Sequence, residues 1–151
     1  MAFELARVYA EFFSLLKNNA TILSTVGHNT RHQVPNIYRE TAPPGVTYPC
    51  IVMKSNSGTR FSSARYIQGI GAEKICLKGV MDVIFYTDNP DYGICVTIAD
   101  ILETIFYTDQ TSNDDIFIGY HVESPISYTY ENDGRTYTAT GVRVGYMAYA
   151  I

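Results

Sequence analysis

The histidines are the first residues in this 151-residue chain whose spacing suggests chemistry. His28 and His32 are four residues apart, a spacing that puts two metal ligands on one face of a helix. The segment between them follows Gly27 and has no helical period, and no carboxylate or thiol follows at a standard distance. We therefore expect no metal site here, and we expect His121, alone in a predicted strand, to be structural.

The three cysteines, Cys50, Cys76 and Cys95, form no metal-binding or redox pattern. Their number is odd, no two of them have the CxxC spacing, and each lies among apolar residues. We expect buried, reduced thiols, which are typical of proteins in a reducing cytosol.

Three further features suggest chemistry less strongly. The segment Gly69 to Gly71 lacks the pattern of a phosphate-binding loop and precedes no helix, while Asp114-Asp115 is typical of a solvated loop. Asp82 and Arg143 lie in predicted strands, where they either pair with one another or point to solvent. No nucleophile motif is present. The sequence therefore predicts neither an enzyme nor a bound cofactor.

A basic and aromatic loop is the strongest candidate binding site. Residues 56–72 are rich in serine, glycine and arginine and show no helical period, although an irregular edge hairpin would also fit. Its candidate contact residues are Arg60, Phe61, Arg65 and Tyr66, flanked by Lys54 and Lys74. Cations interleaved with aromatic rings bind single-stranded nucleic acid or an acidic protein surface. Because the whole chain is acidic and has no basic helix, we expect no sequence-specific nucleic-acid partner.

Charge is distributed unevenly along the chain, whose net charge is −4. Residues 1–80 carry nine Lys/Arg and four acids, whereas residues 81–151 carry two and eleven. Either the two halves mix on one surface, or the subunit has two unlike faces that suit head-to-tail or ring contacts. No apolar run is long enough to span a membrane. The amphipathic N-terminus also lacks the pattern of a signal peptide.

Helical periodicity appears at the N-terminus and again after the middle of the chain. Apolar spacing predicts a helix over Phe3–Lys17, followed by a short helix that Asn19 caps and Gly27 closes. A third helix is expected over residues 90–107, with Asn89 as its N-cap and an apolar stripe along one face.

Strands account for most of the remaining chain. The predicted strands are Cys50–Ser55, Lys74–Thr87, Ile116–Val122, Ile126–Tyr130 and Thr136–Ala150. Pro43, Pro44 and Pro49 stiffen the approach to the first of them, and Asp133-Gly134 predicts a tight hairpin. Residues 28–38 read as irregular or briefly extended, and Thr108–Asp115 reads as a polar loop.

Five tyrosines crowd the last predicted strands, and cross-strand aromatic pairing is their simplest explanation. They are Tyr128, Tyr130, Tyr137, Tyr146 and Tyr149. Helices and antiparallel strands are partly segregated along the chain, which predicts an α+β fold. We expect one domain over residues 1–151, with a mostly antiparallel sheet packed against the N-terminal helix and the central helix.

Several segments of the sequence occur in the order found in a known protein family. The first helices end in LLKNNATILSTVG, and the proline-rich APPGVTYPCIV leads into the first strand. A long strand ends in VIFYTDN, the helix ICVTIADILETI follows, and a tyrosine-rich hairpin closes the chain. Over nearly its whole length the chain thus resembles the tail terminator, or tail-completion, proteins of long-tailed bacteriophages.

The resemblance implies a small α+β structural subunit of the virion neck, assembled in the host cytoplasm, with no enzymatic activity and no cofactor. Such subunits form a hexameric ring that caps the tail tube, ends its polymerisation and joins the tail to the head. The implied partners are other copies, the tail tube protein, a head-completion protein and, in some tails, a sheath, with no direct membrane contact. Because the family directs its long early loop at the tube, Arg60, Phe61, Arg65 and Tyr66 are the expected tube contacts.

Two alternatives stay open beside the tail terminator. Another neck or connector subunit, such as a head-closure or tail tube protein, has a similar design, although a tube protein would polymerise instead of stopping at one ring. A small-molecule enzyme or binder that used the tyrosine-rich sheet would need a deep pocket with convergent polar groups.

Overall fold

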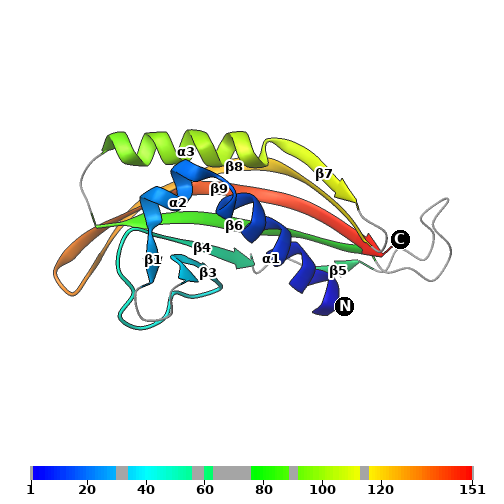
Figure 1. The fold of residues 1–151 in the computed structure, drawn as a ribbon, viewed down its shortest axis with the longest axis horizontal. Helices are drawn as coiled ribbons and strands as arrows, with labels where there is room; N and C mark the ends of the chain where they lie inside the picture. The colour runs from blue at the N-terminus through cyan, green and yellow to red at the C-terminus, as the bar shows by residue number, and fades with distance from the viewer. Residues whose placement is uncertain are drawn as a thin grey trace.

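The computed structural model describes residues 2–29, 34–55, 60–62, 76–88, 92–112 and 116–150. Within these ranges the chain forms three helices, a two-stranded sheet and a seven-stranded sheet (Figure 1). The helices are α1 (Ala2–Lys17), α2 (Ala20–Val26) and α3 (Tyr92–Phe106). The strands are β1 (His28–Asn29), β2 (Val34–Pro35), β3 (Ile37–Arg39), β4 (Cys50–Ser55), β5 (Arg60–Ser62), β6 (Cys76–Thr87), β7 (Thr108–Ser112), β8 (Ile116–Asn132) and β9 (Arg135–Ala150).

The three helices lie where the apolar periodicity predicts them. The Asn19 side chain accepts a hydrogen bond of 3.1 Å from the Ile22 N–H, which confirms it as the N-cap of α2. Gly27 closes that helix, and its N–H donates to the Leu23 carbonyl. The predicted cap of α3 at Asn89 lies outside the described residues. No helix in the described part of the chain is long and apolar enough to cross a membrane.

The large sheet has the strand order β3-β4-β6-β9-β8-β7, and β5 also pairs with β6. Only the pairing of β3 with β4 is parallel. The centre of the sheet is the long antiparallel pairing of β6 with β9, and β9 continues into the hairpin with β8. The strands of the first half of the chain therefore lie on one side of β6 and β9, and those of the second half lie on the other.

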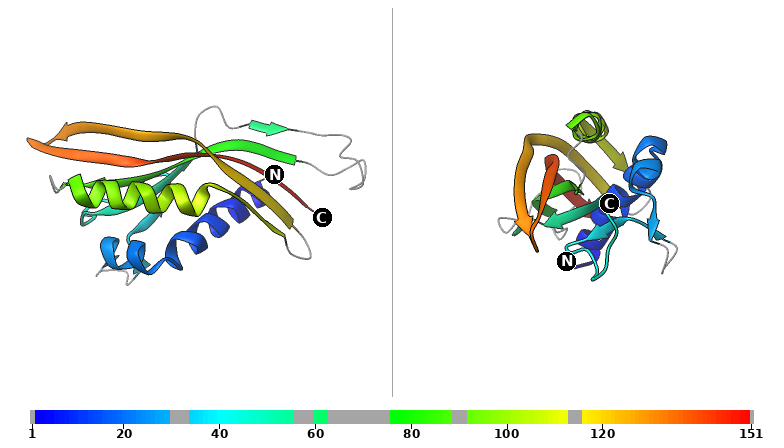
Figure 2. Two further views of the ribbon diagram at one scale, coloured as in Figure 1. Left: turned by 90° about the horizontal axis from the view of Figure 1, so that it is seen from above. Right: turned by 90° about the vertical axis from the view of Figure 1, so that its left-hand side faces the viewer.

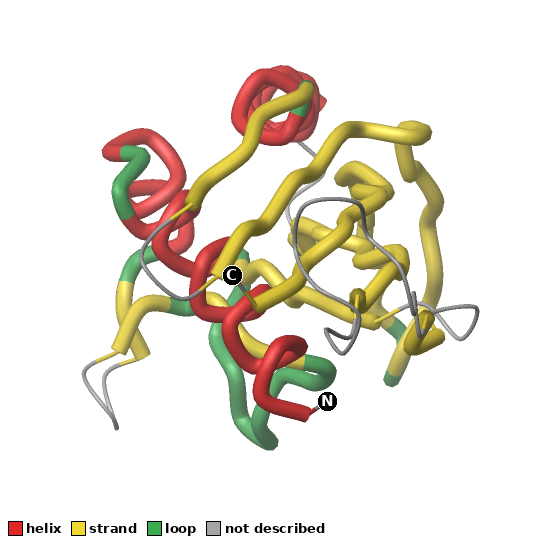
Figure 3. The backbone as a smooth tube through the Cα atoms, turned by 90° about the vertical axis from the view of Figure 1, so that its right-hand side faces the viewer, coloured by secondary structure: helices red, strands yellow, loops and turns green. Residues whose placement is uncertain are grey.

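The helices cover one face of this sheet and leave the opposite face open (Figure 3). Residues with odd numbers in β6, such as Val83 and Phe85, face the helices and are fully buried. On β9 the even-numbered Val142 and Val144 share that face. An α+β domain with its N-terminal and central helices on the sheet is thus confirmed.

Phe12 of α1 is the centre of the core between the helices and the sheet. Its ring is fully buried and lies 4.9 Å from the Phe106 ring of α3. The rings of Tyr120 on β8 and Tyr146 on β9 meet it edge-on at 5.5 Å and 6.2 Å. Edge-to-face contacts at such distances add to the free energy gained from burial. One aromatic group therefore connects both long helices to the last two strands.

Asn36 connects α2, the proline-rich segment and β4. Its side chain is 2 % exposed and donates to the Val26 carbonyl (3.1 Å) and to both oxygens of Thr47. Its backbone carbonyl accepts from the Ile51 N–H at 2.9 Å. These bonds satisfy the buried amide and hold the segment before β4, in which the Tyr48–Pro49 peptide bond is cis.

The hairpin between β8 and β9 turns at Asp133-Gly134, as predicted. Both residues have positive φ angles, 52° and 75°, which is the backbone of a type I′ turn and suits an Asp-Gly pair. Figure 2 shows this hairpin extending at one end of the molecule, beside α3.

Two boundaries predicted in the second half of the chain are wrong. Thr108–Ser112 is not a loop but the edge strand β7, which pairs with Phe117–His121 through its backbone, while its wholly polar sequence hides its strand character. Ile116–Val122 and Ile126–Tyr130 are not separate strands, because β8 is continuous through a register shift between Val122 and Ser124. Pro125 is tolerated in β8 because β7 no longer pairs with the strand at that point.

Candidate functional site

The open face of the sheet carries a second, smaller apolar cluster. Cys50, Val52, Ile84 and Ala139 lie on this face and are between 0 % and 5 % exposed, although no helix covers them. Tyrosine rings gather on the same face. The tyrosine cluster, as we call it, consists of Tyr48, Tyr86, Tyr128, Tyr130 and Tyr137.

The rings of the tyrosine cluster are in mutual contact. Tyr130 and Tyr137 are partners across the β8–β9 pairing, and their rings stack at 5.2 Å. Tyr48, from the segment before β4, lies 4.9 Å from Tyr137. Tyr86 of β6 meets Tyr130 edge-on at 6.0 Å, and its hydroxyl is 3.1 Å from that of Tyr128. The cluster therefore joins the hairpin to β6 and to the approach to β4.

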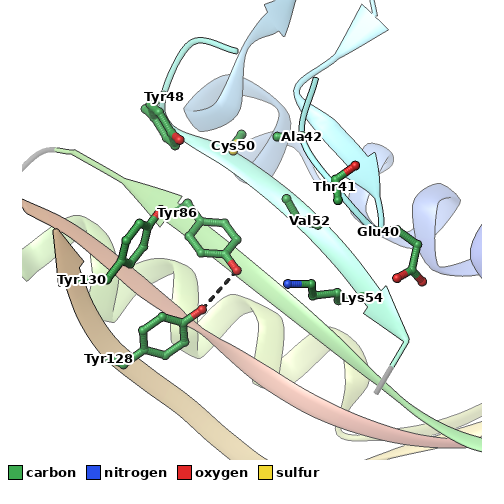
Figure 4. A pocket seen from close by; sticks show the side chains of 10 residues that line it. All are labelled: Glu40, Thr41, Ala42, Tyr48, Cys50, Val52, Lys54, Tyr86, Tyr128 and Tyr130. Atoms are coloured by element: carbon green, nitrogen blue, oxygen red, sulfur yellow. Dashed lines mark hydrogen bonds between the residues drawn. The ribbon is translucent and has the colours of Figure 1, made fainter. Parts of the chain in front are cut away.

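An open depression of about 340 Å³ lies beside the tyrosine cluster (Figure 4). It is lined by Glu40, Thr41, Ala42, Tyr48, Cys50, Val52, Lys54, Tyr86, Tyr128 and Tyr130. Figure 4 shows Glu40 and Lys54 at one end and the tyrosines at the other. Its volume is at the lower end of the range for small-molecule sites. It offers aromatic faces and hydroxyl groups, with one acid and one amine.

The thiol and three of the phenols in the depression, those of Tyr48, Tyr86 and Tyr130, are protonated at neutral pH. Burial raises the pKa of the Cys50 thiol to about 12, so this sulfur is not a nucleophilic thiolate. Burial also raises the pKa of Tyr86 and Tyr130, with their hydrogen bonds to neighbouring tyrosines adding to the effect. The pKa of Tyr48 is raised, again chiefly by burial. The depression can therefore donate hydrogen bonds and stack on apolar groups.

Asp82 and Arg143 are partners on the open face, which decides between the two readings of the sequence. They are opposite one another in the pairing of β6 with β9. The guanidinium donates from Nε to Oδ1 at 2.9 Å and from Nη2 to Oδ2 at 3.2 Å, a two-point contact. These hydrogen bonds and the carboxylate charge raise the pKa of Arg143. The pair satisfies Asp82, which is mostly buried.

The histidines do not come together in the described residues. His28 begins β1, and His32 lies outside the described ranges, as do Asp114 and Asp115. His121 on β8 is well exposed and lies 3.6 Å from a Glu123 carboxylate oxygen. Among the described residues, no three His, Cys, Asp or Glu side chains are placed to hold a metal ion.

The predicted contact loop is described only at its start. Arg60 and Phe61 belong to β5, opposite Lys78 and Leu77 of β6, so this part of the loop is an edge strand of the sheet. The rest of residues 56–72, including Arg65 and Tyr66, lies outside the described residues. The structure places Lys54 and Lys78 on the same open face, on β4 and β6.

The sequence predicts some members of the tyrosine cluster but not all of them. Tyr130 and Tyr137 pair across the strands as predicted, whereas Tyr128 lies opposite Ala139 and contacts the Tyr130 ring along β8. Tyr146 lies on the opposite, helix-covered face with Phe12. Tyr86 and Tyr48 are the missed members. The even number of Tyr86 in β6 places it beside the open-face Asp82 and Ile84, which is the signal that could have found it.

Comparison with known proteins assigns no family to this chain. No protein-family model matches it. A search of curated proteins also gives no significant match. Proposals for its function therefore rest on its own residues and on the resemblance in the order of its elements.

Proposed function

We propose that this chain is a tail terminator of a long-tailed bacteriophage: a structural subunit of the virion neck that forms a ring on the end of the tail tube. The ring stops tube polymerisation and provides the surface that joins tail to head. The proposal concerns a subunit without enzymatic activity, whose partners are other copies, the tube protein and a head-completion protein.

The order of elements along the chain is the observation that carries the proposal. A helix pair, α1 and α2, precedes a proline-rich approach to β4. The long β6, the helix α3 and the tyrosine-rich β8–β9 hairpin then follow in turn. This is the order in which the sequence resembles tail terminators.

The chemistry of the open face supports a role in protein contact. Its thiol and phenol groups are protonated at neutral pH, and its best-defined charged pair, Asp82 with Arg143, is satisfied within the chain. Tyrosine rings with hydroxyl groups at their edges are common in protein interfaces, because they contribute apolar area and hydrogen bonds together.

Mass measurement combined with electron microscopy of the purified full chain, alone and with tail tubes, tests the proposal. We expect a ring of one discrete mass that sits only at the ends of tubes. A monomer that ignores tubes would count against the proposal. Open-ended polymers would instead favour the alternative of a tail tube protein.

Charge reversal in residues 56–72 tests the proposed tube contact. We expect Arg60→Glu/Arg65→Glu to reduce the fraction of capped tubes while the circular dichroism spectrum stays that of the folded protein. The matched control is Lys17→Glu/Arg135→Glu, which makes the same charge change at two exposed positions outside the loop. If the loop variant caps tubes as well as the control does, the loop is not the tube contact.

A further inference from the structure

In the part of the chain that the structure describes, the far half of β8 has a free edge. β7 pairs with β8 only from Phe117 to His121, and one more hydrogen bond follows, from the Val122 N–H to the Tyr107 carbonyl at 3.1 Å. Over residues 123–132, β9 is the one strand among the described residues that pairs with β8. A free edge of this length presents a row of backbone donors and acceptors to another chain.

A groove runs along this edge between β8 and α3. Its volume is about 400 Å³, and it is lined by Cys95, Val96, Ala99, Asp100, Ser127, Tyr128, Thr129, Thr138 and Thr140. Val96 is 60 % exposed and Tyr128 is 44 % exposed. Figures 1 and 2 show α3 lying alongside the hairpin here. The edge thus combines backbone hydrogen-bonding groups with apolar side chains open to solvent.

Acidic residues outnumber basic ones in this region, and the two arginines of the neighbouring strand β9 are engaged within the chain, Arg135 with Asp88 at 3.8 Å and Arg143 with Asp82 at 2.9 Å. From Tyr92 to Gly134 the sequence has no Lys or Arg and eight acids. Asp100 lines the groove, Glu103 follows it on the exposed side of α3, and Glu123 begins the free edge. We call this surface, residues 123–132 with Asp100 and Glu103, the acidic edge. Its charge favours a basic occupant.

A basic surface of the same chain lies on β4 and β6, with β9 between it and the acidic edge. Lys54 of β4 and Lys78 of β6 are exposed on the open face and form what we call the basic side. The acids near them are engaged within the chain. Glu40 accepts from the Ser55 N–H at 3.0 Å, and Asp82 accepts from Arg143. The strand order thus separates the two kinds of charge across the sheet.

We infer that copies of this chain associate head to tail, with the acidic edge of one copy on the basic side of the next. The two surfaces are complementary and different, so the contact is heterologous and repeats around a closed ring when its rotation closes. The inference rests on the proposed function only where it concerns closure of the contacts into a ring. The contact itself can be measured without tail tubes.

Two charge-reversal variants test the contact, measured by analytical ultracentrifugation of the full chain. Asp100→Lys/Glu123→Lys changes the acidic edge, and Lys54→Glu/Lys78→Glu changes the basic side. We expect each variant alone to associate about tenfold more weakly or worse. Mixed together they should associate again, because the intact basic side of one variant meets the intact acidic edge of the other, and the two reversed surfaces are complementary as well. A chain with all four substitutions should regain association, since its two surfaces are again complementary.

The outcomes separate this inference from the proposed function. A wild-type chain that is monomeric both in solution and with tubes, or variants that associate as the wild type does, would overturn the inference. Failure of the mixture to associate would overturn it too, provided that a Lys17→Glu control, which changes an exposed charge outside both surfaces, associates normally. Rings that respond to these variants but ignore tubes would leave the inference standing and remove the proposed function. Rings that cap tubes but do not respond to the variants would support the proposed function and overturn the inference.

Discussion

Gly141 of β9 lies directly against the backbone of β6. A Cβ atom at this position would lie 2.0 Å from the Val83 carbonyl oxygen and 2.9 Å from the Ile84 Cα. Both are backbone atoms of β6, so neither can move aside as the end of a side chain would. The absence of a side chain at this one residue allows β9 to pair with β6 as closely as it does.

We expect Gly141→Ala to destabilise the protein by about 3 kcal/mol, because the added methyl group must push the two central strands apart. For a chain of this size the melting temperature should fall by roughly 6–12 °C. The measurement is thermal unfolding followed by circular dichroism. Gly119→Ala is the control, since its Cβ would meet only the Phe117 ring, at 3.2 Å. A Gly141→Ala protein as stable as the control would show that β6 and β9 can separate at little cost.

The tyrosine cluster shows how elements far apart in sequence are joined on the open face. Tyr48 precedes β4, Tyr86 ends β6, and Tyr130 and Tyr137 come from the hairpin. Each ring is held by rings from other elements, so the cluster stabilises the hairpin where no helix covers this face. Its phenols and the thiol beneath them are neutral in the folded state.

Alkaline pH should therefore weaken the fold. The pKa values of Tyr86 and Tyr130 are raised above their ordinary value of 10.0, and that of Cys50 is raised from 9.0 to about 12. The folded state thus holds these protons more tightly than the unfolded state does. The stability they contribute is complete below pH 9 and is lost as the pH rises toward the folded-state values.

Urea unfolding at pH 7, 9 and 10.5 measures this loss. We expect Tyr86→Phe/Tyr130→Phe to show a smaller fall in the free energy of unfolding than the wild type, because two of the titrating groups are gone. Tyr107→Phe is the control, since that side chain is 68 % exposed. Equal falls in all three proteins would mean that the cluster does not set the alkaline limit.

The sequence predicts the elements whose side chains alternate or repeat with a clear period. Val8, Phe12 and Leu16 mark α1 in this way, and Cys50–Ser55 is confirmed without change. β7 was missed because its polar residues show no alternation of apolar and polar side chains, and its pairing is made by the backbone. The sequence predicts two strands, Ile116–Val122 and Ile126–Tyr130, where β8 is one, because local patterns do not show that pairing with β9 continues through the register shift.

The two parts of the tyrosine cluster were not equally predictable. Tyr130 and Tyr137 flank a recognisable turn, so their pairing follows from local sequence alone. Tyr48 and Tyr86 join them through the order of strands in the sheet, which local patterns do not contain. The loop residues Arg65 and Tyr66 stay a prediction.

At the scale of the whole molecule, charge is unevenly distributed along the sequence, and the strand order places its basic part and its acidic part on opposite sides of the sheet. The basic half of the sequence supplies β3, β4 and β5, and the acidic half supplies β7, β8 and α3. A head-to-tail contact between such sides gains part of its free energy from long-range attraction.

Salt should therefore weaken the association of copies. Between about 0.1 M and about 1 M NaCl the Debye length falls from about 10 Å to about 3 Å, which screens exposed charges from one another. We expect the dissociation constant, measured by ultracentrifugation, to rise several-fold over this range. An association that strengthens in high salt would point to a contact dominated by apolar burial, for which the exposed Val96 and Tyr128 would be the first residues to test.

The tyrosine cluster also gives the molecule an optical signature. The chain has 13 tyrosines and no tryptophan, so its near-ultraviolet absorption comes mainly from phenol rings. Rings held in fixed orientation a few ångströms apart, as Tyr130 and Tyr137 are at 5.2 Å, couple their electronic transitions. The near-ultraviolet circular dichroism of this protein should thus report on the tyrosine cluster, together with Tyr120 and Tyr146 of the core. The spectrum of the unlabelled protein would therefore show whether the β8–β9 hairpin is packed on the open face or detached from it.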